Sequence, residues 1–132
     1  MTVQLKIKIK MNNSEITTCA LANTRFEGLG PDIMIPMNIA QALNIRLNPS
    51  DSEVYAIRTA SGIAPIYRFK GYVLAKVIVN DRDTPLIPLS PVISESMDQV
   101  ILSDKALSAL GIVIINAGEG VWCFNDELGK SV

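Results

Sequence analysis

The sequence predicts a β-rich domain that carries one or two short helices, and three observations lead to this fold class. Residues 3–10, VQLKIKIK, alternate apolar and polar side chains, which is typical of a strand with one buried face. Short apolar segments then recur along the chain, each bounded by turn-forming residues such as Asn, Asp, Gly and Pro. Only residues 37–43 and 104–110 carry the end signals of a helix.

The first 22 residues predict a hairpin. The alternation in residues 3–10 places Val and the Leu and Ile side chains on one face and the lysines on the other, so we expect a half-exposed antiparallel strand. Residues 11–14, MNNS, supply a turn, and residues 15–22 run back as a more apolar strand. A polar loop begins where this second strand ends.

The next segment predicts a central strand followed by a helix. Residues 33–36, IMIP, are short and apolar and end in proline, which favours a buried strand that stops before a proline-initiated helix over residues 37–43. Asn44 is a suitable residue for the C-terminal end of this helix. Residues 48–51, NPSD, form a turn after the chain has returned to the core.

The middle of the chain predicts strands joined by tight turns. Residues 54–58 and 64–69 flank the small tip Thr-Ala-Ser-Gly, which gives a hairpin, and residues 72–79 give a third strand. A polar turn, NDRD, follows at residues 80–83. The proline-punctuated apolar stretch 86–93 comes next.

The last third predicts a capped helix and a final hairpin. Ser103 or Asp104 can cap the helix at its start, and Gly111 can terminate it. Two apolar segments, residues 112–115 and 121–124, then flank the turn Asn-Ala-Gly-Glu-Gly. The second of these segments supplies the chain's one tryptophan, at position 122, as a large core or interface side chain.

The length, composition and charge of the chain argue against several classes of protein. With 132 residues, 48% of them hydrophobic, we expect a single domain over residues 1–132 with a modest core. No apolar run approaches the roughly 20 residues of a membrane-spanning helix, and the alternating N-terminus is unlike a signal peptide, so a cytoplasmic location is expected. The 12 basic and 13 acidic residues nearly balance, and with 5% aromatic residues they predict no nucleic-acid partner.

The cysteine and histidine content narrows the chemistry. The chain has two cysteines, Cys19 and Cys123, and no histidine, which excludes ordinary Cys/His zinc sites and Ser-His or Cys-His nucleophiles. Both cysteines lie in apolar segments, so we expect buried free thiols, with a disulfide between them left open. Neither a metal nor a cofactor is expected, although a site built from carboxylates alone is not excluded.

Two stretches of the chain carry a resemblance to a known family. Residues 16–45 contain an apolar strand, then Asn23-Thr24-Arg25, a glycine-bearing turn, an Ile-rich strand ending in Pro, and a helix that closes in Leu-Asn-Ile. Residues 100–112 contain apolar residues, Ser-Asp, and a helix that closes in Leu-Gly-Ile. This order of features is similar to that of the retropepsin-like aspartic peptidases, the retroviral-protease type, and it covers residues 16 to 124.

The resemblance implies a fold, an assembly and a site. The fold would be a closed β-barrel in which one helix-to-strand unit is used twice, at residues 39–45 and 106–112. Because each family lobe supplies one catalytic carboxylate, the site would form between two chains of a homodimer. The cleft between subunits would then be lined by Arg25, Phe26 and Glu27 from the loop and by the flap-like tip, Ser61 and Gly62, and would accept a peptide or another extended ligand.

The same resemblance shows what is missing from the site. Asn23 stands where the family has its catalytic aspartate, Arg25 where it has a glycine, and Ser103, just before Asp104, where it has the second glycine. Thr24 matches the threonine that holds the two loops together across the interface. An aspartic peptidase needs two carboxylates about 3 Å apart that share a proton, and neutral asparagine amides cannot take a proton from water.

Other acids lie near the position of the missing one. Glu27 and Asp32 follow Asn23 in the loop and Asp104 begins the second helix, but acids at such positions are usually solvated or cap a helix. Arg25 has two interpretations: a surface ion pair with Glu27 or Asp32, or an anion-binding residue that faces the cleft.

Three functions therefore remain after the sequence alone. The first is a catalytically inactive, peptidase-like homodimer that binds a peptide in its cleft. The second is an active aspartic endopeptidase that uses another acid or whose aspartate was replaced by Asn23 in this sequence, although the changes at Arg25 and Ser103 argue against a deliberate replacement. The third is a purely structural dimer.

Overall fold

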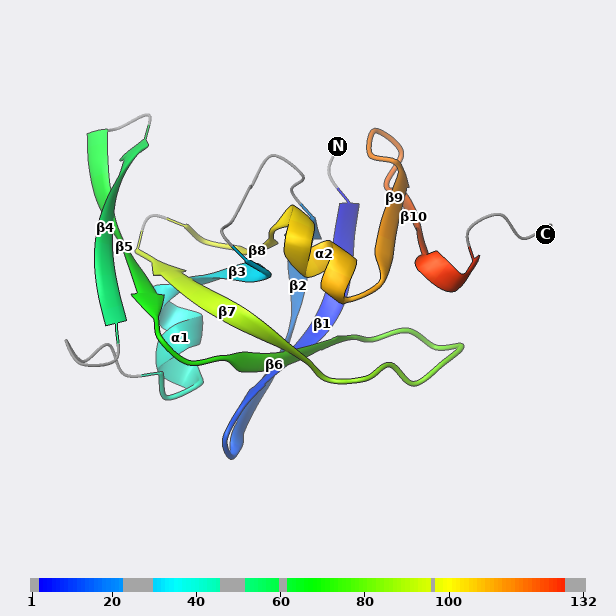
Figure 1. Ribbon diagram of the computed structural model, residues 1–132, viewed down its shortest axis with the longest axis horizontal. Coiled ribbons are helices and arrows are strands. Elements are labelled where there is room, and N and C mark those ends of the chain that lie inside the picture. Colours follow the sequence, from blue (N-terminus) through cyan, green and yellow to red (C-terminus); the bar gives the residue numbers. More distant parts are fainter. Residues whose placement is uncertain (1–2, 23–29, 46–51, 60–61, 96, 128–132) are drawn as a thin grey trace.

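The computed structural model describes residues 3–22, 30–45, 52–59, 62–95 and 97–127. Strands dominate this part of the chain, as the sequence predicted (Figure 1). The elements in order are β1 (Val3–Met11), β2 (Ser14–Ala22), β3 (Asp32–Pro36), α1 (Met37–Ala42), β4 (Ser52–Thr59), β5 (Gly62–Phe69), β6 (Val73–Val77), β7 (Ile87–Ser94), β8 (Val100–Leu102), α2 (Asp104–Ala109), β9 (Ile112–Asn116), β10 (Val121–Phe124) and the 3-10 helix η1 (Asn125–Glu127).

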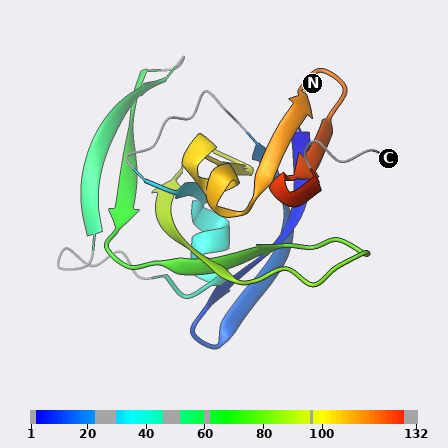
Figure 2. The same cartoon turned by 45° about the vertical axis from the view of Figure 1, so that its right-hand side comes forward.

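Six strands close into a mixed barrel, which confirms the predicted fold class. The main sheet runs in the order β3-β8-β2-β1-β6-β7-β5-β4, and an additional pairing between β3 and β7 closes its first six strands. Two of the pairs in this ring, β2 with β8 and β3 with β7, are parallel, and the others are antiparallel. Figure 2 shows the strands curving around the interior that this closure creates.

The alternating face of β1 forms part of the barrel interior. Val3, Leu5, Ile7 and Ile9 are each at most 2% exposed, whereas the lysines between them lie on the outer face. The strand pairs with β2 on one side and β6 on the other, so every second residue points into the core of a closed sheet. The predicted period-two strand and its hairpin with residues 15–22 are therefore confirmed.

Both helices are short and end at the residues that the sequence indicated. Helix α1 begins directly after Pro36 and is followed by Asn44, which adopts a positive φ of 59°. Helix α2 is capped by Ser103, whose Oγ accepts a hydrogen bond from the backbone N–H of Ala106 at 3.1 Å. Gly111 follows this helix with a φ of 76°, a conformation in which a Cβ atom would be strained.

Of the helix-to-strand unit predicted at residues 39–45 and 106–112, the second copy is described in full, with α2 leading into β9, whereas residues 46–51 after α1 lie outside the described residues. Strands β3 and β8 are antiparallel neighbours in the barrel, and each strand leads into its own helix. In the barrel β3 and β8 therefore lie side by side, with β2 on the other side of β8 and β7 on the other side of β3. Sequence periodicity did not specify this arrangement, which depends on pairings between distant segments.

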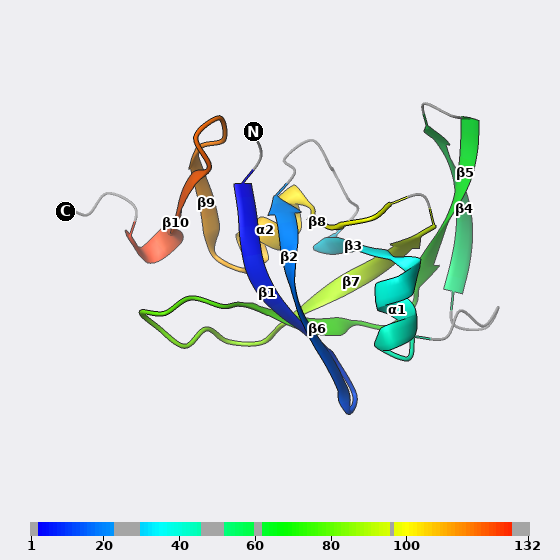
Figure 3. The same ribbon diagram turned by 180° about the vertical axis from the view of Figure 1, so that it is seen from behind.

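Two hairpins extend from the barrel at opposite ends. Strands β4 and β5 pair along eight positions, and β5 joins the barrel through β7. Strands β9 and β10 form a separate two-stranded sheet beside α2. The views from the front and from behind place these hairpins on opposite sides of the barrel (Figures 1 and 3).

The structure corrects two details of the sequence analysis. Cys19 is exposed and Cys123 is only partly buried, so the expectation of two buried thiols is wrong, although both are free. Cys19 points outward because it lies on β2 beside Lys6, on the solvent face of the hairpin. The strand expected over residues 72–79 is also shorter, since β6 covers Val73–Val77. Within the described residues no helix is long and apolar enough to cross a membrane.

Candidate functional site

The loop that carries most of the predicted site lies outside the described residues. This applies to Asn23, Thr24, Arg25, Phe26 and Glu27, and also to Ser61 at the tip of the β4–β5 hairpin. The structure describes the strands on either side of this loop in the sequence, β2 before it and β3 after it. The predicted site residues that can be placed are Gly62, Ser103 and Asp104.

A buried ion pair anchors the chain where β3 begins. Asp32 is 0% exposed, and its two carboxylate oxygens accept hydrogen bonds from the guanidinium of Arg68 at 2.9 and 3.1 Å. Arg68 is on β5, and its Nη1 also donates to Ser90 Oγ on β7 at 3.2 Å. This two-point geometry is the strong form of a carboxylate–guanidinium contact. It joins β5 of the β4–β5 hairpin to the start of β3 and to β7 in the barrel.

The same aspartate is tied to the start of α2 through its backbone. Ser103 is 0% exposed, and its Oγ accepts from the Asp32 N–H at 3.0 Å as well as from the Ala106 N–H. The Ser103 N–H in turn donates to the Asp32 carbonyl at 3.0 Å. Ser103 therefore has a structural role, because it caps α2 and fixes β3 against β8.

The structure overturns the expected solvation of Asp32. The sequence suggested a solvated loop acid, but the residue is buried and Arg68 binds its carboxylate. The possible pairing with Arg25 involves a residue outside the described part of the chain. Both oxygens of this carboxylate accept hydrogen bonds from the same guanidinium, so Asp32 links β3 to β5. Arg68 and Ser90 were missed by the sequence analysis, since nothing in a local pattern marks a strand arginine as the partner of an acid 36 positions away.

Asp104 has the helix-start role that its position predicted. Its carboxylate accepts a hydrogen bond from the Lys105 N–H at 2.8 Å, and it is the acidic residue in the first turn of α2. A carboxylate here interacts favourably with the positive end of the helix. Both described acids near the loop, Asp32 and Asp104, thus make contacts that stabilise the ends of β3 and α2.

The flap-like hairpin has the short tip that the sequence predicted. Gly62 pairs with Thr59 across the hairpin, so two residues connect the strands, and Gly62 adopts a φ of 129° that favours glycine. Ile63 beside it is 74% exposed. An exposed apolar side chain at the tip of a projecting hairpin is suited to contact a bound chain or a second subunit.

A hollow of about 380 Å³ lies beside the buried ion pair. It is enclosed by the base of the β4–β5 hairpin, the chain before β3 and the β5–β6 connection, and Tyr72 at its edge is 65% exposed. The residues that line it are Gly30, Pro31, Asp32, Glu53, Arg68, Phe69, Lys70, Gly71, Tyr72 and Ser90. Its lining carries both charges, which suits the polar backbone of a peptide better than an apolar molecule.

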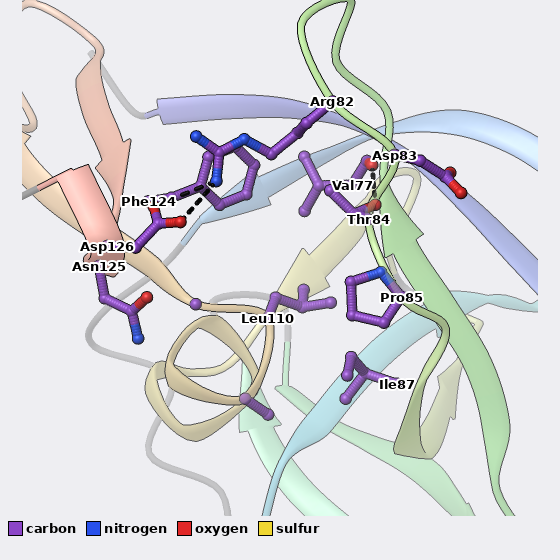
Figure 4. A pocket seen from close by; sticks show the side chains of 12 residues that line it. Val77, Arg82, Asp83, Thr84, Pro85, Ile87, Leu110, Phe124, Asn125 and Asp126 are labelled. Carbon is purple, nitrogen blue, oxygen red and sulfur yellow. Dashed lines mark hydrogen bonds and ion pairs between the residues drawn. The ribbon is translucent and has the colours of Figure 1, made fainter.

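A second hollow, of about 280 Å³, lies where α2 ends (Figure 4). Apolar side chains from β6, β7, α2 and β10 form its interior, among them Val77, Ile87, Leu110 and Phe124. Arg82 lies over the Phe124 ring, with its guanidinium carbon 4.4 Å from the ring centroid.

Acidic residues surround Arg82 at the edge of this second hollow. Its guanidinium contacts both oxygens of Asp126 at 3.0 and 3.1 Å and one oxygen of Glu127 at 3.8 Å. The hydrogen bond to Asp126 is the main cause that raises the pKa of Arg82 above its ordinary value. These contacts hold the β6–β7 loop against η1.

Comparison with known proteins adds no family assignment. No protein-family model matches the chain, and a search of the curated proteins finds no similar sequence. Among the described residues, no group of three or more His, Cys, Asp or Glu side chains could hold a metal ion. The site must therefore be interpreted from its own geometry.

Proposed function

We propose that this chain is a catalytically inactive, retropepsin-like homodimer that binds an extended peptide between its subunits. The observation that carries the proposal is the binding of the Asp32 carboxylate by Arg68, just after the sequence segment that contains Asn23. With asparagine at the family position, and with Asp32 and Asp104 both engaged in structural contacts, Glu27 is the remaining acid near the loop. General-base hydrolysis by this loop is therefore not expected.

The architecture supports the retropepsin-like part of the proposal. A closed six-stranded barrel, two short helices and a projecting hairpin with a glycine-bearing tip agree with the features that the resemblance implied. The mixed lining of the hollow beside Arg68 provides both hydrogen-bond donors and acceptors. An extended peptide presents both kinds of group along its backbone.

The β9–β10 hairpin supports the assembly into a homodimer. Neither strand, IVIIN or VWCF, carries a charged side chain, and Ile115 and Val121 are 58% and 42% exposed. Uncharged strand edges with exposed apolar residues favour pairing with another chain. Two copies of the same strand edge can pair with each other about a two-fold axis, so a second copy of this chain is the simplest partner for the hairpin.

The competing function is an active aspartic endopeptidase, and a direct assay separates the two. The unchanged chain and Asn23→Asp are incubated with unfolded protein substrate from pH 3 to pH 8, with Asn38→Asp, an exposed position on α1, as the control for the same substitution. We expect no cleavage by the unchanged chain or the control, and light scattering should give a dimer for all three. Pepstatin-sensitive cleavage by the unchanged chain contradicts the proposal.

Binding is measured separately, so that inactivity alone does not count as support. A statine-containing peptide analogue should raise the melting temperature of the unchanged chain without turnover, because a ligand that binds the folded state stabilises it. If no peptide analogue of any length stabilises the chain and a dimer still forms, the purely structural dimer is the correct interpretation.

A further inference from the structure

A second ligand site, unrelated to the proposed peptide cleft, is indicated by the hollow at the end of α2. Its walls are the end of β6, the β6–β7 loop, the start of β7, the end of α2 and the β10–η1 segment. Figures 1 and 3 place these elements on the side of the barrel opposite the β4–β5 hairpin. A ligand bound here would therefore not contact the hollow beside Arg68.

The size of the hollow suits a small ligand. A cavity of roughly 150 Å³ lined by apolar side chains is large enough to bind benzene. The hollow here measures about 280 Å³, and its interior is formed by Val77, Pro85, Ile87, Leu110 and Phe124 (Figure 4). It can hold one aromatic ring with a short aliphatic chain, which is the size of a single large side chain or of a fragment-sized molecule.

The charge at the edge of the hollow selects the head group. Arg82 is the one basic residue among the described residues that line the hollow. It forms ion pairs with both Asp126 and Glu127, so this group of three side chains has a net charge of −1. Asp83 adds a carboxylate that is 92% exposed and contacts Lys76 at 3.3 Å. An anionic ligand would meet this carboxylate excess, whereas a cationic head group would be attracted by it.

We infer that the hollow between α2, the β6–β7 loop and η1 binds a cationic amphiphile: an aromatic or branched apolar group that carries an ammonium or guanidinium head. The apolar group occupies the space between Leu110 and Phe124, and the head group lies at the Asp126 side of the opening. The head group takes a share of the carboxylates that Arg82 contacts in the structure.

The chain contains its own reporter for this site. Trp122 is the single tryptophan, and its ring packs edge to face on Phe124 with the centroids 5.2 Å apart. Because Phe124 forms part of the wall, a ligand that displaces or covers it changes the surroundings of the indole. Tryptophan fluorescence therefore follows occupancy without a label.

Three probes of the same shape test the inference on the unchanged protein: phenethylamine, 2-phenylethanol and phenylacetate. We expect phenethylamine to bind about three- to tenfold more tightly than phenylacetate, with the neutral alcohol between them. The fluorescence change should be accompanied by NMR shifts of the methyl groups of Val77, Ile87 and Leu110, but not of Ile63. Equal or reversed affinities, or shifts confined to other residues, overturn the inference.

A matched pair of variants tests the contribution of the carboxylate. In Asp126→Asn, the ratio of the phenylacetate Kd to the phenethylamine Kd should fall to less than half of its value in the unchanged protein. Glu119→Gln makes the same change of charge on the exposed β9–β10 turn and should leave this ratio unchanged. Equal effects of the two variants would mean that general charge and not this site selects the amine. If Asp126→Asn does not fold, the probe series on the unchanged chain still decides.

Discussion

At the scale of single residues, the Asp32–Arg68 pair makes the strongest prediction about stability. Arg68→Met leaves a fully buried carboxylate without its guanidinium, and breaking a buried pair in this way costs about 3 kcal/mol. Lys76→Met is the control, because Asp83, the partner of Lys76, is 92% exposed, and this pair should contribute less than about 1 kcal/mol. Urea unfolding gives both values, and similar losses for the two variants would contradict the assigned role of the buried pair.

Ser103 makes a second prediction at this scale. Ser103→Ala removes both the cap of α2 and the acceptor for the buried Asp32 N–H, so we expect a loss of about 2 kcal/mol in the free energy of unfolding. Ser108→Ala, at an exposed position on the same helix, should change it by less than about 0.5 kcal/mol. Urea unfolding compares the pair. A loss for Ser103→Ala no larger than that for Ser108→Ala would mean that the cap adds nothing to stability.

The residue scale is also where sequence reasoning was weakest. The helix caps at Ser103 and Gly111 could be predicted because their partners lie within a few positions along the chain. The burial of Asp32 could not, since it depends on an arginine brought close by the pairing of β5 with β7 and of β7 with β3. An isolated acid next to Pro31 carries the same local signal whether it is solvated or buried.

At the scale of elements, local patterns were sufficient for most strands and both helices. Alternation identified β1 because one of its faces is buried and the other is solvated. The free thiol at Cys19 was misjudged for the related reason that β2 is apolar on both faces near its end, so its composition does not distinguish the inner face from the outer one. Register with β1 settles which face is exposed.

A glycine at the end of α2 gives a prediction at the element scale. Gly111→Ala should cost about 1 kcal/mol, because the position has a φ of 76° while the nearest atom to an added Cβ, Asn125 Oδ1, is at an ordinary contact distance of 3.6 Å. The cost is then one of backbone conformation, without a steric clash. Gly118→Ala, in the exposed turn between β9 and β10, serves as the comparison. Thermal unfolding of the two variants checks the difference, and equal melting temperatures would refute it.

At the scale of the whole molecule, closure of the barrel brings the site together. The pairing of β3 with β7 completes the ring, and it also places Ser90 beside Arg68 and Asp32. No window of the sequence contains this information, because parallel pairs such as β3–β7 join segments separated by long connections. The periodicity of the sequence predicted the individual strands, and only the resemblance to retropepsins predicted that they close into a barrel.

The proposed dimer gives the prediction at this scale. If the β9–β10 hairpin joins two copies, dissociation exposes Ile115 and Val121 again, and the apparent melting temperature should rise with protein concentration. Ile115→Glu should place a charge in each copy of the interface, weaken dimerisation at least about tenfold and abolish the concentration dependence.

The control for Ile115→Glu is a substitution on a different surface. Leu74→Glu, on the outer face of β6, changes a side chain that is 38% exposed and should leave the dimer intact. Analytical ultracentrifugation of the three proteins separates the outcomes. If the Ile115→Glu variant is still a stable dimer, the dimer interface lies on another surface of the barrel. If the unchanged chain is a monomer, there is no cleft between subunits, and the proposed peptide site that pairs two Asn23 residues cannot form.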